Sequence, residues 1–129
     1  MSFPDSLDYI CADGCLTIRL RNSDILVQME PTIRRIAALI EARQPKATLI
    51  DFRDVPPPTS FMERYQLGEL AGRYLANRLI ATLLRPDQAD RQQIGKVVAL
   101  NRGAIVEVFI DEGEADAWLR QHAQPDPAP

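Results

Sequence analysis

The sequence is poor in the residue types on which metal binding commonly depends. Its 129 residues include only one histidine and two cysteines. A structural zinc site needs more thiol or imidazole ligands than these residues supply. No apolar run approaches the roughly 20 residues that a membrane-spanning helix needs. The sequence therefore predicts neither a metal centre nor a membrane span.

Recognisable catalytic motifs are also missing. The chain has no glycine-rich phosphate loop and no serine nucleophile with a histidine in plausible reach. Its one histidine, His122, lies at the edge of a proline-rich tail, whereas a general base needs a partner and a pocket. We therefore assign His122 no role and expect neither enzymatic activity nor a cofactor.

Charge and length limit the class of protein further. The formal net charge is -3, so no basic surface is expected for nucleic acid or an anionic membrane. The N-terminus has no basic region followed by an apolar stretch, which argues against a secretory signal and favours the cytoplasm. The length suits a single core, which we place at residues 1–121. Residues 122–129 are expected to form a disordered tail.

The first part of the chain predicts a β-hairpin, with strands from Leu7 to Ile10 and from Cys15 to Leu20. Leu16, Ile18 and Leu20 alternate with polar residues, so the second strand should have one buried and one solvated face. Cys11 and Cys15 flank the turn and could face each other across it. A reducing cytosol disfavours a disulfide, so we expect buried or half-buried free thiols.

Strands and helices alternate in the rest of the chain, which predicts an α/β domain. Helical spacing extends from an N-cap at Ser23 to Arg43, but Pro31 should kink it or start a separate main helix, and residues 24–30 also fit a strand. The apolar run at Lys46–Phe52 predicts a parallel strand covered on both faces, and the runs at Leu79–Leu84 and Ile105–Ile110 are predicted as its parallel neighbours.

Further helices are predicted between and after these strands. The first runs from Ser60 to Ala76, with apolar stripes that include Phe61 and suggest burial over a wide face. The next is capped by Asp87, points Ile94, Val97 and Val98 inward and stops at Gly103. The last is capped by Asp111 and Glu114, and it places Ala115, Trp118 and Leu119 on one face.

Two glycines, Gly68 and Gly72, lie inside the predicted helix from Ser60 to Ala76. Each costs roughly 1 kcal/mol relative to alanine in a helix, so something should offset them. Close approach to the sheet or to a neighbouring helix is one explanation, and room for a ligand is the other. We favour close packing, since glycine in a helix usually has a packing reason.

Several stretches of the chain resemble a known family. They are TLIDFRDV at 48–55, the helix start at Thr59-Ser60, the apolar strand LIATLL, and ALNRGAIVEVFIDEGEADAWL at 99–119. Together they resemble the STAS domain superfamily, and in particular the bacterial SpoIIAA-like (STAS/SEC14-like) family. The resemblance implies a mixed four- to five-stranded sheet with an N-terminal hairpin and about four packed helices. It also implies a protein partner and no enzymatic activity.

The resemblance further implies a phosphoacceptor at the start of the second helix, which falls at Thr59 or Ser60. The chain departs from the family here, because Pro58-Thr59-Ser60-Phe61 stands where the regulated antagonists carry Asp-Ser-Ser-Gly. Ser60 and Glu63 also form a capping box, worth about 1 kcal/mol, which explains the serine without any regulation. We favour capping and keep phosphorylation as the second hypothesis.

The ends of the parallel strands should meet at one edge, where ligands bind in open sheets. Arg53 and Arg85 could hold an anion there, although surface salt bridges with Asp51, Asp54 or Asp87 are the simpler expectation. A protein partner or, as the SEC14-like resemblance implies, a small apolar or lipid-like ligand would contact this edge. The candidate contacts are Asp51, Phe52, Arg53, Asp54, Phe61, Tyr65, Arg85 and Asp111. A homodimer could form through the hairpin edge or the second helix.

Overall fold

A mixed five-stranded sheet forms the centre of the domain, with strand order β1-β2-β3-β4-β5. The computed structural model describes residues 7–21, 28–56, 60–89 and 93–123. The strands are β1 (Leu7–Ala12), β2 (Cys15–Arg21), β3 (Ala47–Asp54), β4 (Leu79–Leu83) and β5 (Ile105–Phe109). β1 is antiparallel to β2, and all other neighbours are parallel. The predicted α/β class and mixed sheet are confirmed.

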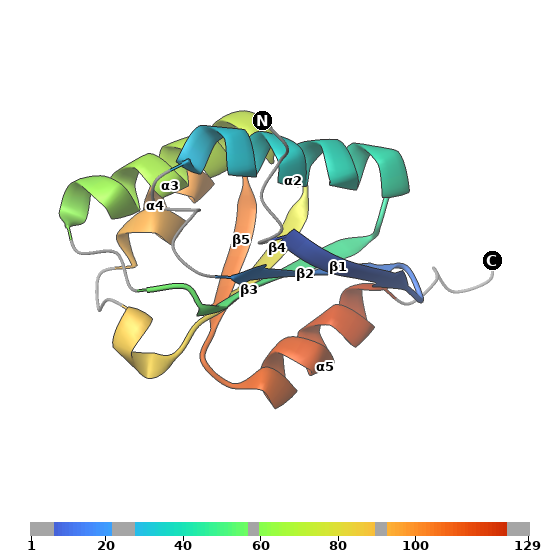
Figure 1. Ribbon diagram of the computed structural model, residues 1–129. Helices are drawn as coiled ribbons and strands as arrows, with labels where there is room; N and C mark the ends of the chain where they lie inside the picture. The colour runs from blue at the N-terminus through green and yellow to red at the C-terminus, as the bar shows by residue number, and fades with distance from the viewer. Residues whose placement is uncertain (1–6, 22–27, 57–59, 90–92, 124–129) are drawn as a thin grey trace.

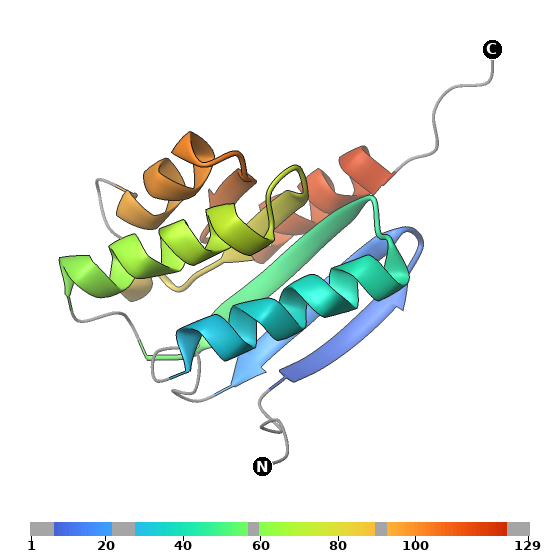
Figure 2. The ribbon, with the colours of Figure 1, turned by 90° about the horizontal axis from the view of Figure 1, so that it is seen from above.

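Helices cover both faces of the sheet (Figure 1). α2 (Met29–Arg43), α3 (Phe61–Tyr74) and α4 (Ile94–Asn101) lie on one face, which we call the helix face, and α5 (Glu112–Ala123) lies on the other, the α5 face. Seen from above, α2, α3 and α4 follow one another in chain order (Figure 2). Because consecutive parallel strands are neighbours and their crossovers keep one hand, the three crossover helices fall on the same side.

Alternating side chains build one apolar core on each face. On β2, Leu16, Ile18 and Leu20 are buried against the helix face, as predicted from their spacing. On β3, Leu49 belongs to the α5 face and Ile50 to the helix face, and both are buried. The prediction that this strand is covered on both sides is confirmed.

The two cysteines are separated by the sheet. Asp13 and Gly14 form the hairpin turn with positive φ angles of 56° and 80°, which favour a tight turn between twisted strands. The register pairs Cys11 with Leu16 and Cys15 with Ala12. Cys11 lies opposite Leu16, which is the neighbour of Cys15 on β2, and adjacent strand residues point to opposite faces. The two thiols therefore point to opposite faces of the sheet, and the expectation that they could face each other was wrong. Cys15 is half-buried as expected, but Cys11 is exposed.

The predicted helix boundaries need correction at two places. α2 begins at Met29 with Pro31 in its first turn, which confirms a main helix starting near Pro31; Ser23 and residues 24–27 lie outside the described residues. Asp87 does not cap the next helix, because Pro86–Gln88 form a separate 3-10 turn, η1, and α4 starts only at Ile94. Val97, expected to point inward, is 47% exposed.

The last helix follows its predicted cap. The Asp111 carboxylate accepts the backbone N–H of Glu114 at 3.0 Å, and Ala115 and Leu119 are buried against the α5 face. α5 runs to Ala123, beyond the domain end expected at residue 121, and residues 124–129 lie outside the described part of the chain. Among the described helices, none is long and apolar enough to cross a membrane.

Candidate functional site

Ser60 caps α3 at the carboxyl side of the sheet. Its Oγ accepts the backbone N–H of Glu63 at 3.1 Å, and its own backbone is extended, with φ of -140°. The serine half of the predicted capping box is therefore confirmed. Ser60 is exposed to solvent, whereas Thr59, the other candidate phosphoacceptor, lies outside the described residues.

An exposed apolar surface begins directly after this cap. Phe61 and Met62 are 58% and 57% exposed, so the expectation that Phe61 belongs to a buried stripe was wrong. The Phe61 ring stacks on the ring of Tyr65, with centroids 6.2 Å apart. Tyr65 is held in turn by Arg102 of the α4 C-terminus, which donates to its hydroxyl at 3.1 Å. We call Phe61, Met62 and Tyr65 the α3 apolar surface.

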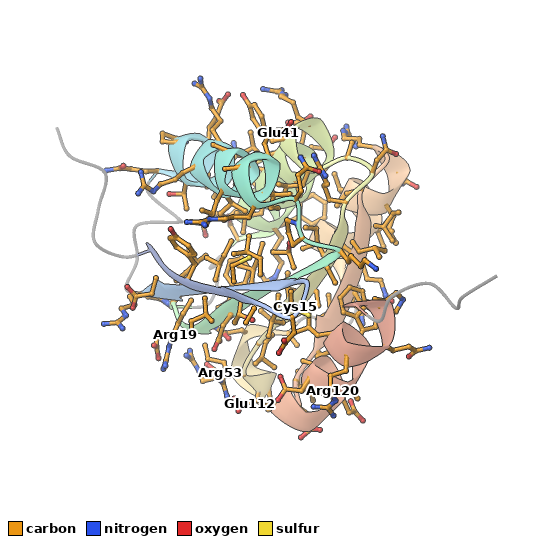
Figure 3. The ribbon with its side chains drawn as sticks, turned by 90° about the vertical axis from the view of Figure 1, so that its right-hand side faces the viewer. Cys15, Arg19, Glu41, Arg53, Glu112 and Arg120 are labelled. Carbon is orange, nitrogen blue, oxygen red and sulfur yellow. The ribbon has the colours of Figure 1, made fainter. Side chains whose placement is uncertain are left out.

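A buried carboxylate anchors the end of β3 on the other face of the sheet. Asp51 is 6% exposed and accepts hydrogen bonds from the Arg53 backbone N–H at 2.9 Å and from its guanidinium at 2.9 and 3.0 Å. Arg53 also pairs with Glu112, the first residue of α5, at 2.9 Å. Figure 3 shows Arg53 and Glu112 on the side of α5. Arg53 is thus committed to carboxylates of the chain itself.

Two further arginines at this edge form similar pairs. Arg19 pairs with Asp54, and Arg85 pairs with Asp87, each at 2.9 Å. The simpler expectation of ordinary ion pairs at this edge is therefore confirmed. Among the described residues, no group of three or more His, Cys, Asp or Glu side chains is placed to hold a metal ion.

Gln88 joins two loops and was missed by sequence reasoning. This buried side chain donates to the carbonyl oxygens of Phe52 and Val55 and accepts the backbone N–H of Arg85 at 2.7 Å. It therefore ties η1 to the end of β3. A lone glutamine in a polar loop carries no sequence signal for such burial, because its acceptors come from a distant strand.

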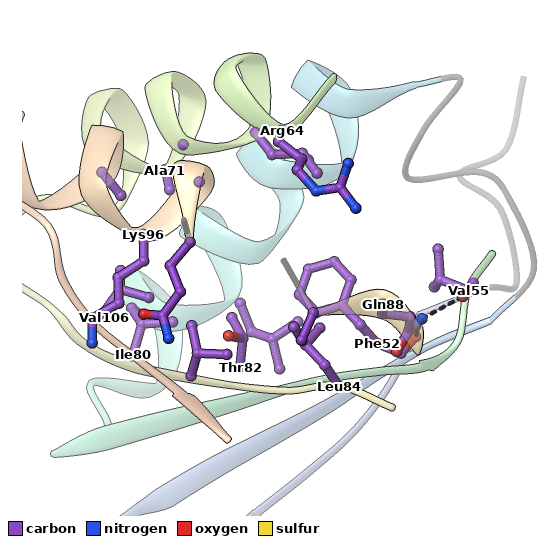
Figure 4. A pocket seen from close by; sticks show the side chains of 18 of the residues that line it. Phe52, Val55, Arg64, Ala71, Ile80, Thr82, Leu84, Gln88, Lys96 and Val106 are labelled. Atoms are coloured by element: carbon purple, nitrogen blue, oxygen red, sulfur yellow. Dashed lines mark hydrogen bonds between the residues drawn. The ribbon is translucent and has the colours of Figure 1, made fainter. Parts of the chain in front are cut away.

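An apolar cavity of about 170 Å³ lies between α3, α4 and the helix face of β3, β4 and β5. Figure 4 shows the side chains of strands and helices that surround it. Its lining is Ile33, Ile50, Phe52, Val55, Pro56, Arg64, Leu67, Gly68, Ala71, Leu75, Ile80, Thr82, Leu84, Gln88, Ala89, Gln93, Gly95, Lys96, Ala99, Val106 and Val108.

The predicted contact residues fall into separate places. Phe52 lines the cavity on the helix face. Asp51 pairs in register with Leu83 of the α5 core, so it lies on the opposite face. Phe61 and Tyr65 belong to the outer surface of α3. The residues that sequence spacing assigned to one edge therefore form two surfaces and a cavity.

Close packing of α3 and α4 accounts for the two glycines. A Cβ atom at Gly68 would lie 2.4 Å from the carbonyl oxygen of Gly95, and one at Gly72 would lie 2.4 Å from the Cβ of Arg102. The favoured explanation, approach to a neighbouring helix, is confirmed. Gly68 also lines the cavity.

Comparison with known proteins identifies the fold. The sequence matches no protein-family model and no curated protein. The crystal structure of an anti-sigma factor antagonist from Mycobacterium paratuberculosis is similar to this chain, with a TM-score of 0.57 and 15% sequence identity. The match covers 93% of this chain and 99% of that chain. The chain therefore has the STAS-like fold predicted from its sequence.

Proposed function

We propose that this chain is a non-enzymatic regulatory domain that binds a protein partner through the α3 apolar surface. The observation that carries the proposal is the pair Phe61 and Met62, both more than half exposed at the start of one helix. Exposed clusters of large apolar side chains mark contact sites. The similar structure is described as an anti-sigma factor antagonist, a name that supports action on another protein.

The surface has the properties of a preorganised anchor. Phe61 rests on Tyr65, and Tyr65 is fixed by the hydrogen bond and ring contact of Arg102. An aromatic side chain held in one position loses little conformational entropy on binding. Aromatic anchors of this kind supply much of the binding energy in protein interfaces.

Partner capture tests this proposal. Immobilised wild-type domain and the double variant Phe61→Ser, Met62→Ser are compared in extract of the native cell. We expect the wild-type domain to capture one partner protein that the double variant does not capture. The control is Leu100→Ser, since Leu100 of α4 is 43% exposed but lies outside the surface. With the purified partner, Phe61→Ala should raise the Kd about thirtyfold, because the loss of this aromatic anchor should cost about 2 kcal/mol of binding free energy. Equal capture by all forms contradicts the proposal.

We extend the proposal to control by phosphorylation at Ser60 or Thr59. A phosphate on Ser60 would meet the N-terminal amides of α3, which favour an anion. It would also place a charge of about -2 beside the exposed Phe61, which disfavours an apolar contact. Mass spectrometry of the domain isolated from its native cell should detect the modified residue. Its absence under varied stress conditions contradicts this extension.

A second candidate function is that of a carrier or sensor for a small apolar ligand. The apolar cavity between α3, α4 and the sheet is the observation that favours it. Native mass spectrometry of the purified domain distinguishes the two functions. A bound small molecule supports the carrier, and a clean protein mass supports partner binding alone. The same spectrum reports whether the chain forms the homodimer expected from its edge strand or second helix.

A further inference from the structure

We infer that the cavity binds one small neutral apolar molecule, a single ring or a short hydrocarbon chain without a charged or hydrogen-bonding head group. This inference rests on the second candidate function and names its ligand class. It follows from the volume of the cavity, from the apolar character of its walls and from the partners that the polar side chains of its lining already have.

The volume limits the size of the ligand. The cavity measures about 170 Å³, and an apolar protein cavity of about 150 Å³ holds one benzene molecule. The space therefore accepts one ring or a chain of about six to eight carbon atoms. Sites for drug-sized molecules are larger, about 300–1,000 Å³. A molecule with several fused rings or a long acyl chain does not fit.

The walls are suited to a hydrocarbon group. Ile50, Ile80 and Val106 form the sheet side, and Leu67 and Ala71 form the α3 side. A water molecule inside a protein needs about two to four polar partners, and these side chains supply none. Hydrocarbon placed here leaves bulk water without displacing hydrogen-bonded water from the cavity, so each buried methylene adds affinity.

The buried polar side chain of the lining, Gln88, is occupied by the chain itself. Its amide nitrogen carries two hydrogens, and it donates to the carbonyl oxygens of Phe52 and Val55; Figure 4 shows the contact with Val55. Its side-chain oxygen accepts the backbone N–H of Arg85 at 2.7 Å. Gln88 therefore has no hydrogen left to donate to the polar group of a ligand.

The other polar side chains of the lining favour no charged ligand. The Lys96 ammonium lies 3.0 Å from the Glu107 carboxylate, and Arg64 has an interaction of its own within the chain. Thr82 donates to the Glu107 carbonyl oxygen at 3.4 Å, and Gln93 is exposed to solvent. Among the described residues that line the cavity, none is an aspartate or a glutamate. A charged head group would therefore lose its water without gaining an unpaired opposite charge.

Probes of nearly equal size and different polarity test the ligand class. Toluene, phenol, benzoate and benzylammonium each carry one ring, and pyrene carries four fused rings. Binding to the wild-type domain is followed by amide chemical shifts, and we expect saturable one-to-one binding of toluene with the largest shifts at Leu67, Ala71 and Val106. Phenol should bind about tenfold more weakly, because its hydroxyl would be buried without a partner. Benzoate, benzylammonium and pyrene should not shift these amides.

Two matched variants test the position of the site. Ala71→Leu places a larger side chain in the cavity and should abolish toluene binding. The control Ala38→Leu makes the same change at an exposed alanine of α2 that does not line the cavity, so it should leave the Kd for toluene unchanged. If Ala71→Leu does not fold, the shift map of the wild-type domain decides.

Several outcomes overturn the inference. Toluene shifts confined to residues outside the cavity, or equal toluene binding by Ala71→Leu and Ala38→Leu, contradict the site. Tighter binding of phenol, benzoate, benzylammonium or pyrene than of toluene in the cavity contradicts the ligand class and leaves the carrier function standing. If toluene does not bind, the inference fails, and the carrier function fails with it only if the native mass spectrum also shows no ligand. Partner binding through the α3 apolar surface is decided separately by the capture experiment.

Discussion

Asp51 links the end of β3 to α5 through a single arginine. The carboxylate is buried and bonded to the backbone and side chain of Arg53, and Arg53 continues to Glu112. Burial alone would raise the pKa of Asp51, but the hydrogen bonds from Arg53 and the positive charges of Arg53 and Arg19 outweigh it. The pKa of Asp51 therefore lies below its usual value. Folding thus favours the charged form of this carboxyl group.

This pKa shift predicts how stability depends on pH. The folded pKa is below the unfolded one, so the stabilisation is present above about pH 4 and is lost as pH falls through the folded value. Asp51→Asn should remove this dependence and cost about 1–3 kcal/mol of unfolding free energy at neutral pH. Urea unfolding between about pH 3 and pH 7 measures both effects.

The control for this prediction is Asp87→Asn. Asp87 also pairs with an arginine, Arg85, but the pair is exposed on η1, so the substitution should change stability little. An Asp51→Asn variant that keeps the acid sensitivity of the wild type would assign that sensitivity to other carboxylates.

At the scale of elements, α3 and α4 pack closely because α3 carries glycine at two positions that face α4. Gly68 of α3 faces the carbonyl oxygen of Gly95 of α4, and Gly72 faces Arg102, the residue that also holds Tyr65. The same helix pair bounds the cavity and presents the α3 apolar surface. The separation of the two helices therefore affects both candidate sites.

Alanine at the two glycines of this contact should have opposite effects. Gly68→Ala gains about 1 kcal/mol of helix propensity but drives its Cβ to 2.4 Å from a backbone oxygen, so we expect a net loss of about 1–2 kcal/mol. At Gly95 the nearest atom to a new Cβ is the Arg64 carbonyl oxygen at 3.4 Å, so Gly95→Ala should be neutral or slightly stabilising. Thermal unfolding compares the two variants, and equal stability of both contradicts the close contact.

The whole molecule is one sheet with an apolar core on each face. The helix face carries the larger core, and the α5 face is closed by Ala115 and Leu119, with Trp118 packed beside them. Because both cores share β3 and β4, loss of either should weaken the whole sheet. The only tryptophan of the chain lies on α5, so its fluorescence reports the α5 face, while circular dichroism reports all elements.

Leu119→Ala tests this cooperativity. The side chain is 6% exposed, so its truncation should cost about 2–4 kcal/mol. Fluorescence and circular dichroism should still give coincident urea transitions. Leu100→Ala, at a leucine that is 43% exposed on α4, should cost less than about 1 kcal/mol. A fluorescence transition that precedes the loss of circular dichroism would show that α5 unfolds alone.

The sequence by itself determined the features that depend on neighbouring residues. Alternation on β2, the cap of Ser60 on α3 and the cap of Asp111 on α5 are local patterns, because each involves hydrogen bonds or side-chain directions within a few residues. The order of strands and crossover helices follows from these patterns and from the preferred hand of the crossovers. These patterns were enough to predict the α/β class and the N-terminal hairpin, whereas the mixed four- to five-stranded sheet was what the resemblance to the STAS superfamily implied.

Only the tertiary structure decided which residues meet. Asp87 was expected to cap a helix, but its carboxylate pairs with Arg85. Gln88 is buried because its partners, the carbonyl oxygens of Phe52 and Val55, lie at the end of β3 and in the loop that follows it, far away in the sequence. The cavity likewise depends on how closely α3 and α4 approach each other and the sheet, a distance that no local pattern sets. Contacts between distant segments depend on the packing of whole elements, and so the position and size of the candidate site could not be predicted from spacing alone.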